Sequence, residues 1–155
     1  MNIVVLNRSD WRDAEHVRLV DRRADHIRSV LRAAVGDTIR VGEVNGDLGQ
    51  GRICALDANA VVLAVDLNQP PPPRHRFDIV LALPRPKVLR RLFRTVAEYG
   101  VAHLHLINCA RVEKSYWQSP LLAPDKVHDA LLAGIERASD TVAPRVHQHR
   151  RFRPF

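Results

Sequence analysis

Scarce residue types already exclude several classes of protein for this chain of 155 residues. It has only two cysteines, Cys54 and Cys109, and they form no CxxC pair. A disulfide framework and a cysteine zinc site are thereby excluded, and we expect both thiols to be small buried side chains. No apolar run approaches the roughly 18–20 residues that span a bilayer, and the N-terminus lacks the charged region of a secretory signal. We therefore expect a cytoplasmic protein without a membrane partner.

Familiar catalytic motifs are also missing. The sequence contains no GxGxxG, GxxxxGK[ST], HExxH or GxSxG motif. Gly46, Gly49 and Gly51 fall in an expected hairpin rather than between a strand and a helix, which argues against a dinucleotide site. His103 and His105 alternate along an expected strand and share one face, but no third ligand can be named. We therefore predict no metal site.

Lysine is the third scarce residue type. Only three of the 24 basic residues are lysines, the other 21 are arginines, and the formal net charge is +7. Arginine binds phosphate through two parallel hydrogen bonds and stacks on bases, so its excess favours an RNA partner. Genomic base composition also raises arginine content, but it does not determine where along the chain the charge lies.

A run of four prolines at residues 70–73 divides the chain. Such a run is extended and semi-rigid, and it lacks the amide donors that a sheet requires, so it predicts a linker. Residues 1–73 carry 9 basic and 10 acidic side chains, whereas residues 74–155 carry 15 basic and 7 acidic ones. All of the excess positive charge therefore belongs to the second part, which predicts an anionic partner there.

The first part has the pattern of a small β-barrel with one helix. Strands are expected at residues 3–6, 38–41, 52–56 and 61–67. A helix is expected over residues 21–32, where apolar side chains recur at helical spacing. Its apolar face consists of Ala24, Ile27, Val30 and Leu31. This part is therefore assigned to the α+β class.

The second part has the alternating pattern of a parallel α/β sheet. Strands are expected at residues 77–83, 101–107 and 142–147. Helices are expected at residues 86–99 and 125–138, each with an apolar stripe. The first of these strands is a nearly continuous apolar run, which is typical of a strand buried on both faces.

Two clusters of basic residues are candidates for RNA binding. The first lies on the helix over residues 21–32 and consists of Arg22, Arg23, His26, Arg28 and Arg32. The second has no acidic neighbour and consists of Arg85, Lys87, Arg90, Arg91 and Arg94. Such unopposed positive charges repel one another unless a polyanion such as RNA lies against them. The alternative for both clusters is a solvated helix face.

A polar segment follows the second strand of the α/β part, where ligands bind in such sheets. Its candidates for an active-site loop are Arg111, Glu113 and Lys114, and Glu136 is a further one. We expect them to position RNA, with Arg111 and Lys114 suited to stabilise negative charge. The alternative is a loop that Trp117 holds in place by packing.

Several segments together resemble a known family. They are residues 22–32 with Gly36 and Asp37, LALPRPK at 81–87, EYGV at 98–101, RVEKSYWQSPLL at 111–122, and residues 136–144. The chain resembles the 16S ribosomal RNA uracil-N3 methyltransferases of the trefoil-knot (SPOUT) superfamily. The resemblance implies a PUA-like RNA-binding barrel over residues 1–72 and the first part of a SPOUT (α/β knot) methyltransferase domain over residues 73–155. It also implies S-adenosylmethionine as the methyl donor, the 16S rRNA or small ribosomal subunit as the partner, and a homodimer at full length.

The sequence departs from that family in two respects. The family continues beyond the position of Phe155 into a glycine-rich GPEGG segment and the knot that holds the donor. We therefore expect the cofactor-binding residues beyond Phe155, name no catalytic residue, and expect residues 1–155 alone to be inactive. Ser139 and Asp140 stand where the family often carries an arginine. The alternatives are a stand-alone, non-catalytic RNA-binding module and a subunit that another chain completes.

Overall fold

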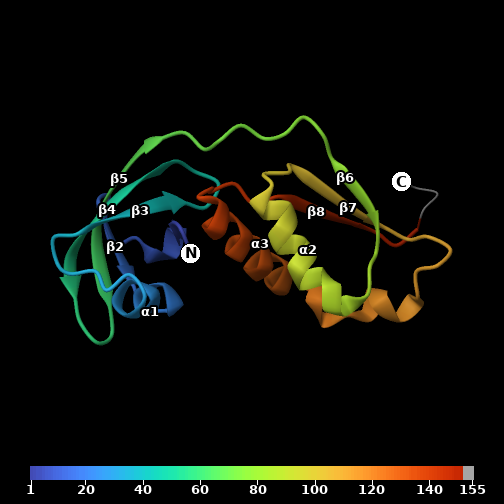
Figure 1. Ribbon diagram of the computed structural model, residues 1–155, viewed down its shortest axis with the longest axis horizontal. Coiled ribbons are helices and arrows are strands. Elements are labelled where there is room, and N and C mark those ends of the chain that lie inside the picture. The colour runs from blue at the N-terminus through green and yellow to red at the C-terminus, as the bar shows by residue number, and fades with distance from the viewer. Residues whose placement is uncertain (152–155) are drawn as a thin grey trace. The chain divides into compact units, whose positions relative to one another are not determined.

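The computed structural model describes residues 1–151, and the chain divides into two compact units (Figure 1). The units are Met1–Pro71 and Pro72–Phe155, so the division falls inside the proline run. No helix among the described residues is long and apolar enough to cross a membrane.

The first unit is a curled five-stranded sheet with one α-helix. Its strands are β1 Val4–Leu6, β2 His16–Leu19, β3 Thr38–Glu43, β4 Leu48–Leu56 and β5 Val61–Gln69. The strand order is β1-β3-β4-β5-β2, and only the β1–β3 pair is parallel. A short 3-10 helix, η1 Arg8–Asp10, follows β1, and the α-helix α1 Arg22–Ser29 follows β2. Asp21 caps α1 by accepting a hydrogen bond from the Arg23 backbone N–H.

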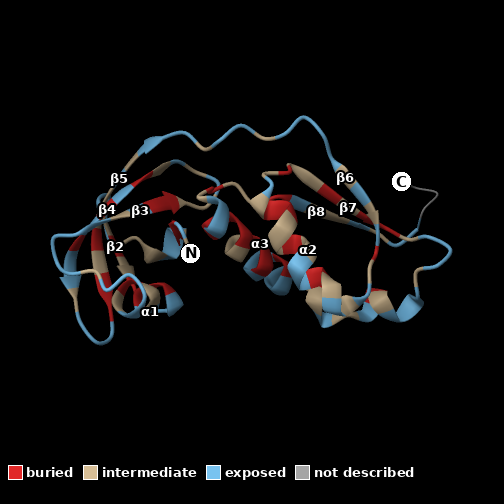
Figure 2. Ribbon diagram, in the orientation of Figure 1, coloured by how far each residue is buried: buried red, intermediate tan, exposed pale blue. Residues whose placement is uncertain are grey.

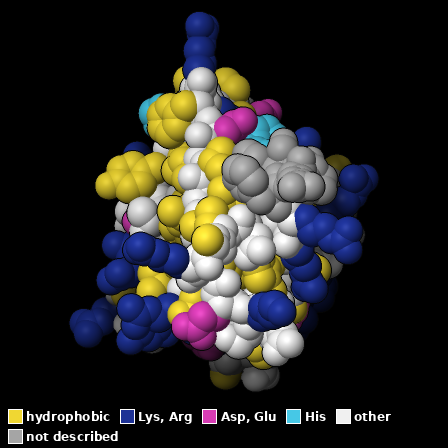
Figure 3. All heavy atoms as spheres, turned by 90° about the vertical axis from the view of Figure 1, so that its right-hand side faces the viewer, with side chains coloured by type: hydrophobic (Ala, Val, Ile, Leu, Met, Phe, Trp, Pro, Cys, Tyr) yellow, Lys and Arg dark blue, Asp and Glu magenta, His cyan; other side chains and the backbone are white. Residues whose placement is uncertain are grey.

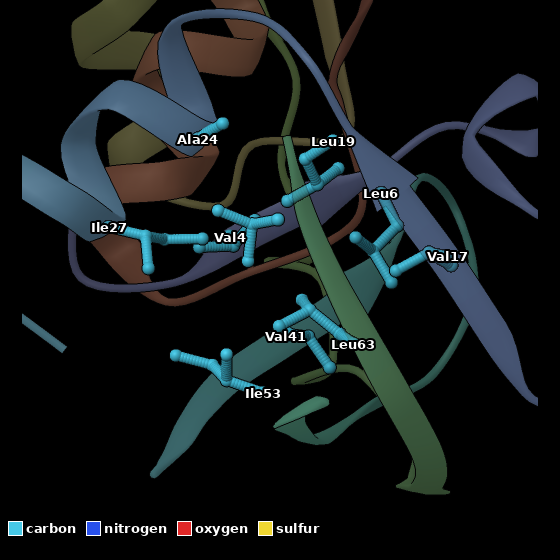
Figure 4. Packing of buried hydrophobic residues seen from close by; sticks show 10 residues of the cluster. Val4, Leu6, Val17, Leu19, Ala24, Ile27, Val41, Ile53 and Leu63 are labelled. Carbon is cyan, nitrogen blue, oxygen red and sulfur yellow. The ribbon is translucent and has the colours of Figure 1, made fainter. Parts of the chain in front are cut away.

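The core of the first unit lies between the inner face of the sheet and α1. Side chains from all five strands and from the helix meet there, including Leu6, Val17, Val41, Ile53 and Leu63 (Figure 4). The helix contributes only Ala24 and Ile27, because it ends at Ser29.

Two expected core residues of the first unit therefore lie outside the core. Val30 and Leu31 are 64% and 46% exposed, so the apolar face predicted over residues 21–32 is only half correct. The expectation of buried thiols was also wrong, because both cysteines are exposed. Cys54 faces outward in β4 because side chains alternate along a strand, and its neighbour Ile53 is the one that faces the core.

The second unit is a three-stranded parallel sheet with two α-helices. Its strands are β6 Ile79–Ala82, β7 His103–Ile107 and β8 Arg145–His149, in that order across the sheet. The helices are α2 Pro86–Glu98 and α3 Pro124–Ala138, and two 3-10 helices, η2 Lys114–Gln118 and η3 Pro120–Leu122, precede α3. Both α-helices lie on one side of the sheet (Figure 1), where they cover Leu104 and Leu106 of β7.

The strand β6 differs from its prediction. It is an edge strand with alternating half-buried and exposed residues, whereas the apolar run 77–83 predicted burial on both faces (Figure 2). Among the three strands described in this sheet, β7 alone has a neighbour on each side. Phe77 and Val80 are consequently exposed.

The helices α2 and α3 pack closely at Gly134. A Cβ atom at this position would lie 2.4 Å from the backbone oxygen of Arg94 and 2.6 Å from the Cβ of Ala97. Only glycine permits this approach, because no side chain separates the two helices there. The contact fixes how near the last turn of α3 comes to α2.

An ion pair ties the start of the second unit to the end of α3. Arg74 Nη2 lies 2.6 Å from Asp140 Oδ2, and Arg74 Nη1 donates to the backbone oxygen of Val142. Asp140 Oδ1 also accepts hydrogen bonds from the backbone N–H groups of Thr141 and Val142. The residue that stands in place of the family's arginine is therefore a buried structural carboxylate here.

Candidate nucleic-acid interface

Four of the five basic residues predicted near α2 meet in one groove. The helix presents them at successive turns, and the groove has a volume of about 530 Å³. Its basic residues from α2 are Lys87, Arg90, Arg91 and Arg94. Pro86 in the first turn of α2 fixes the start of the helix, and Leu89 and Phe93 bury the opposite face. The local sequence thus separates an apolar face from a basic one.

A fifth cation of this groove comes from α3 and was not predicted. Arg137 lines the groove, and its Nη1 lies 3.3 Å from Glu98 Oε1, the one acidic side chain in the lining. Arg137 reaches α2 because Gly134, one turn earlier, brings the helices together. Sequence spacing within one helix cannot reveal such a pairing. The sequence feature that could have indicated this contact between helices is Gly134, an isolated glycine within a helical pattern.

Arg85 lies outside the groove, immediately before α2. It is exposed, and its positive charge acts on the Tyr116 hydroxyl of the loop after β7. Arg85 therefore belongs with the candidate loop at the carboxyl end of the sheet rather than with the groove.

The cluster on α1 is less available than its sequence suggests. Arg23 is only 5% exposed, and its guanidinium lies 2.6 Å from Asp10 and 2.8 Å from Asp21. It also donates to the backbone oxygen of Val5 at 2.7 Å. Burial alone would lower the pKa of Arg23, but its hydrogen bonds to the two aspartates outweigh burial and raise it. These contacts argue against Arg23 as an RNA ligand, because its donors are already used inside the unit.

The other members of the α1 cluster differ in exposure. Arg22 and Arg32 are exposed, as predicted for a binding face. Arg28 is half-buried and pairs with Asp25, and it also donates to the backbone oxygen of Asp57. His26 is half-buried with a buried Nε2 atom, so it does not project into solvent with its neighbours.

The loop after β7 has a polar surface and a packed centre. Arg111 and Lys114 are exposed, whereas Glu113 accepts a hydrogen bond from the Tyr116 hydroxyl at 2.9 Å. This hydrogen bond to Glu113 raises the pKa of the Tyr116 hydroxyl. Trp117 is 8% exposed, and its indole N–H donates to Asn108 Oδ1 at 3.2 Å. Trp117 therefore does hold the loop, and Arg111 and Lys114 extend from it.

Glu136 lies away from that loop. It is 4% exposed and stands in the last turn of α3, which precedes β8 and therefore lies at the amino end of the strands. Arg111, Glu113 and Lys114 follow β7 and lie at the carboxyl end. Grouping Glu136 with the loop was therefore wrong, because α3 carries it to the opposite end of the sheet (Figure 1).

A second cavity, of about 760 Å³, opens at the carboxyl ends of β7 and β8. Its polar lining comes from Asn108, Lys114 and Arg150, and Trp117 supplies an aromatic wall. Figure 3 faces this end of the second unit, where lysine and arginine side chains lie on both sides of a hydrophobic strip. The pocket therefore combines apolar surface with positive charge.

Histidines gather on the sheet face opposite the helices. His103 Nδ1 lies 3.0 Å from His147 Nε2, and His105 Nδ1 lies 3.0 Å from His149 Nε2. Burial and the neighbouring histidines lower the pKa of His147. Among residues 1–151, no group of three or more histidine, cysteine, aspartate or glutamate side chains is arranged to hold a metal ion.

Comparison with known proteins gives consistent matches. Residues 70–155 match a family described as an RNA methyltransferase domain. Over 136 residues the chain is 32% identical to the ribosomal RNA small subunit methyltransferase E of Treponema pallidum (strain Nichols). The matched region covers 87% of this chain and 51% of that protein. The chain thus spans about half the length of this curated relative.

Solved structures share the fold. A probable rRNA-methyltransferase from Porphyromonas gingivalis superposes with a TM-score of 0.71 at 19% identity, over 94% of this chain and 60% of that chain. The ribosomal RNA small subunit methyltransferase E from Neisseria gonorrhoeae, bound to S-adenosyl methionine, superposes with a TM-score of 0.68 at 13% identity, over 96% of this chain and 62% of that chain.

Proposed function

Because this chain belongs to the RNA methyltransferase domain family, we propose that it is part of an enzyme that methylates uracil N3 in 16S ribosomal RNA with S-adenosylmethionine. In this proposal, residues 1–71 form a PUA-like RNA-binding barrel, and the second unit is the first part of a SPOUT methyltransferase domain. The chain spans about half the length of its curated relative, and the contribution proposed for it is contact with RNA.

The observation that carries the proposal is the groove on α2 and α3. Of the described residues, five cationic side chains and a single acid, Glu98, line it. Glu98 forms its ion pair with Arg137 of α3. The positive charges of the α2 side chains therefore have no acidic partner among the described residues that line the groove. RNA phosphates would neutralise this charge and release their counterions, which makes binding favourable and dependent on salt.

The pocket at the carboxyl ends of β7 and β8 does not suit the sulfonium of the methyl donor. In a parallel α/β sheet, a donor would be expected at the carboxyl ends of the strands, where the 760 Å³ pocket lies. The donor's sulfonium is a cation, whereas the charged side chains that line this pocket, among the described residues, are Lys114 and Arg150. Like charges would oppose its binding. We therefore do not assign the donor to this pocket and derive no chemical step through it.

The test is a comparison of RNA binding and donor binding. We expect the chain to bind small-subunit RNA in fluorescence anisotropy, and Arg90→Ala with Arg91→Ala to weaken binding. Lys126→Ala is the matched control, because Lys126 is exposed and lies outside the groove. Calorimetry should show no binding of S-adenosylmethionine to residues 1–155. Tight donor binding by this chain, or unchanged RNA affinity in the groove variant, would contradict the proposal.

A stand-alone RNA-binding module is the second candidate. The observation in its favour is that the described residues form a basic groove, whereas the pocket at the carboxyl ends of β7 and β8 is lined by cations. Sequencing the DNA beyond the codon for Phe155 separates the two. An open frame that runs into a GPEGG-like segment supports the enzyme, whereas a stop codon supports the module.

A further inference from the structure

The basic groove on α2 and α3 changes in charge along its length. Its exposed cations near the start of α2 are Lys87, Arg90 and Arg91. Glu98, the acid of the described lining, stands in the last turn of the same helix. From Lys87 to Arg94 the helix rises about 10 Å, and Glu98 lies one further turn along. The groove therefore has a cationic stretch and, beyond it, an end with an acid.

The end of the groove at Glu98 is electrically neutral. Glu98 Oε1 lies 3.3 Å from Arg137 Nη1, so the two formal charges cancel. The Arg137 side chain is 67% exposed and lines the groove, but a phosphate that approached it would also meet the Glu98 carboxylate. Like charges would oppose that approach. The cation from α3 is thus withheld from an anionic ligand.

The stability of α2 does not account for an acid at this position. The C-terminal end of a helix carries partial negative charge, so an acidic side chain in the last turn is unfavourable and a basic one favourable. Within Pro86–Glu98, all of which the structure describes, the last turn has no basic residue and ends on Glu98. The close approach of α3 at Gly134 already fixes the contact between the two helices. The charge of Glu98 therefore has its clearest effect in the groove.

The groove is suited to the backbone of RNA rather than to its bases. Among the described residues, no aromatic side chain lines it, so it offers no surface on which a base could stack. The cations of α2 recur at helical turns of about 5.4 Å, a spacing close to that of neighbouring phosphates on one strand. Contacts to phosphate carry no sequence information, so this groove would position a strand without reading its sequence.

We propose that the groove follows a short run of consecutive phosphates on one RNA strand, and that Glu98 ends this run by holding Arg137 in an ion pair. The inference rests on the proposed function for its RNA partner. In it, Glu98 is a specificity residue that limits the length of the contact and lowers the affinity. The run of phosphates lies against the α2 cations and stops before Arg137.

The test removes the charge of Glu98 and keeps the shape of its side chain. With Glu98→Gln, Arg137 becomes available to one further phosphate. Anisotropy of a fluorescein-labelled oligouridylate at several salt concentrations should show severalfold tighter binding. The slope of log K against log salt should steepen by about 0.7, the contribution of one phosphate of a single strand. Oligoadenylate should show the same change, because the contact is with the backbone.

Two further variants separate this contact from a change in net charge. Asp129→Asn is the matched control, because Asp129 is exposed on α3 and lies outside the groove lining. It removes the same charge and should change the slope far less. In the Glu98→Gln background, Arg137→Ala should abolish the added slope. Circular dichroism confirms that each variant is folded.

Failure of this inference is distinguishable from failure of the proposed function. If Arg90→Ala with Arg91→Ala weakens RNA binding but Glu98→Gln leaves the slope unchanged, the role of Glu98 is overturned and the groove stands. The same conclusion follows if Asp129→Asn steepens the slope as much, if Arg137→Ala leaves the added slope in place, or if the two oligonucleotides respond differently. If Arg90→Ala with Arg91→Ala leaves RNA affinity unchanged, the proposed function falls and this inference falls with it.

Discussion

In the first unit the basic side chains stand among carboxylates, whereas in the second they gather with few acids between them. The first unit carries 9 basic and 10 acidic residues, and Arg23 is buried between Asp10 and Asp21. The second carries 15 basic and 7 acidic residues, and its α2 cations line an open groove. Arginine content alone therefore does not identify an RNA surface; the acids that surround each arginine decide its role.

The largest effect should come from the buried arginine of the first unit. Arg23→Ala leaves Asp10 and Asp21 without their cation, and removing one partner of a buried ion pair costs about 3–5 kcal/mol. Hydrogen exchange of the α1 amides measures this loss in the first unit. Arg28→Ala is the control, because its pair with the exposed Asp25 should contribute at most about 1 kcal/mol. Equal losses of stability in the two variants would contradict the difference between the buried ion pairs of Arg23 and the exposed pair of Arg28.

Arg74 is an arginine of the second unit that acts as Arg23 does in the first. Its pair with buried Asp140 predicts that Arg74→Ala destabilises the second unit by about 3 kcal/mol. The same pair protects this residue from trypsin. Limited proteolysis near the proline run should therefore cut after exposed Arg76 and spare Arg74, and rapid cleavage after Arg74 would show that the pair does not persist.

A smaller effect concerns how RNA affinity depends on salt. Each arginine–phosphate pair that a substitution removes should reduce the slope of log K against log salt by about 0.7–0.9. Arg90→Ala with Arg91→Ala should reduce the slope more than Arg22→Ala with Arg32→Ala on the first unit. Anisotropy titrations at several salt concentrations measure both slopes. A larger reduction from the first unit would reverse the comparison.

The smallest effect is a difference in acid sensitivity between the units. Burial and neighbouring charges lower the pKa of His147 below its ordinary 6.5, so the unfolded chain binds more protons and the second unit loses stability as pH falls below 6.5. In the first unit, hydrogen bonds from Arg23 outweigh the burial of Asp21 and lower its pKa, so that contribution is lost only as pH falls below 3.8. Between pH 3.8 and 6.5, His147→Asn should reduce the pH dependence of the free energy of unfolding of the second unit, and of that unit alone. Amide exchange, corrected for its intrinsic pH dependence, measures this free energy.

The sequence predicted the second unit better than the first. Strong apolar stripes placed α2 and α3 within a residue or two, because each stripe buries one whole helix face. The strand β2 was missed, because four residues of alternating type give too little pattern. Burial of β6 was overestimated, because an apolar run does not tell whether a strand has one neighbour or two.

The candidate interface was predicted where it depends on one helix and missed where it depends on two. Arg90, Arg91 and Arg94 share a groove because helical spacing puts them together. Arg23 was misjudged because its partner Asp10 lies 13 residues away in the chain and meets it only in the fold. The exposed position of Cys54 follows from the alternation along β4, in which Gln50 and Arg52 also face outward and Ile53 faces inward.

Gly134, where α3 packs against α2, makes the geometry of the basic groove depend on packing in the interior. Any side chain at position 134 would collide with the Arg94 backbone, so α3 would have to move outward and carry Arg137 with it. Such a substitution adds no charge and touches no ligand, yet it would widen the span between the cations of α2 and α3. A substitution at this buried position would therefore change the spacing of the surface cations as well as the stability of the core.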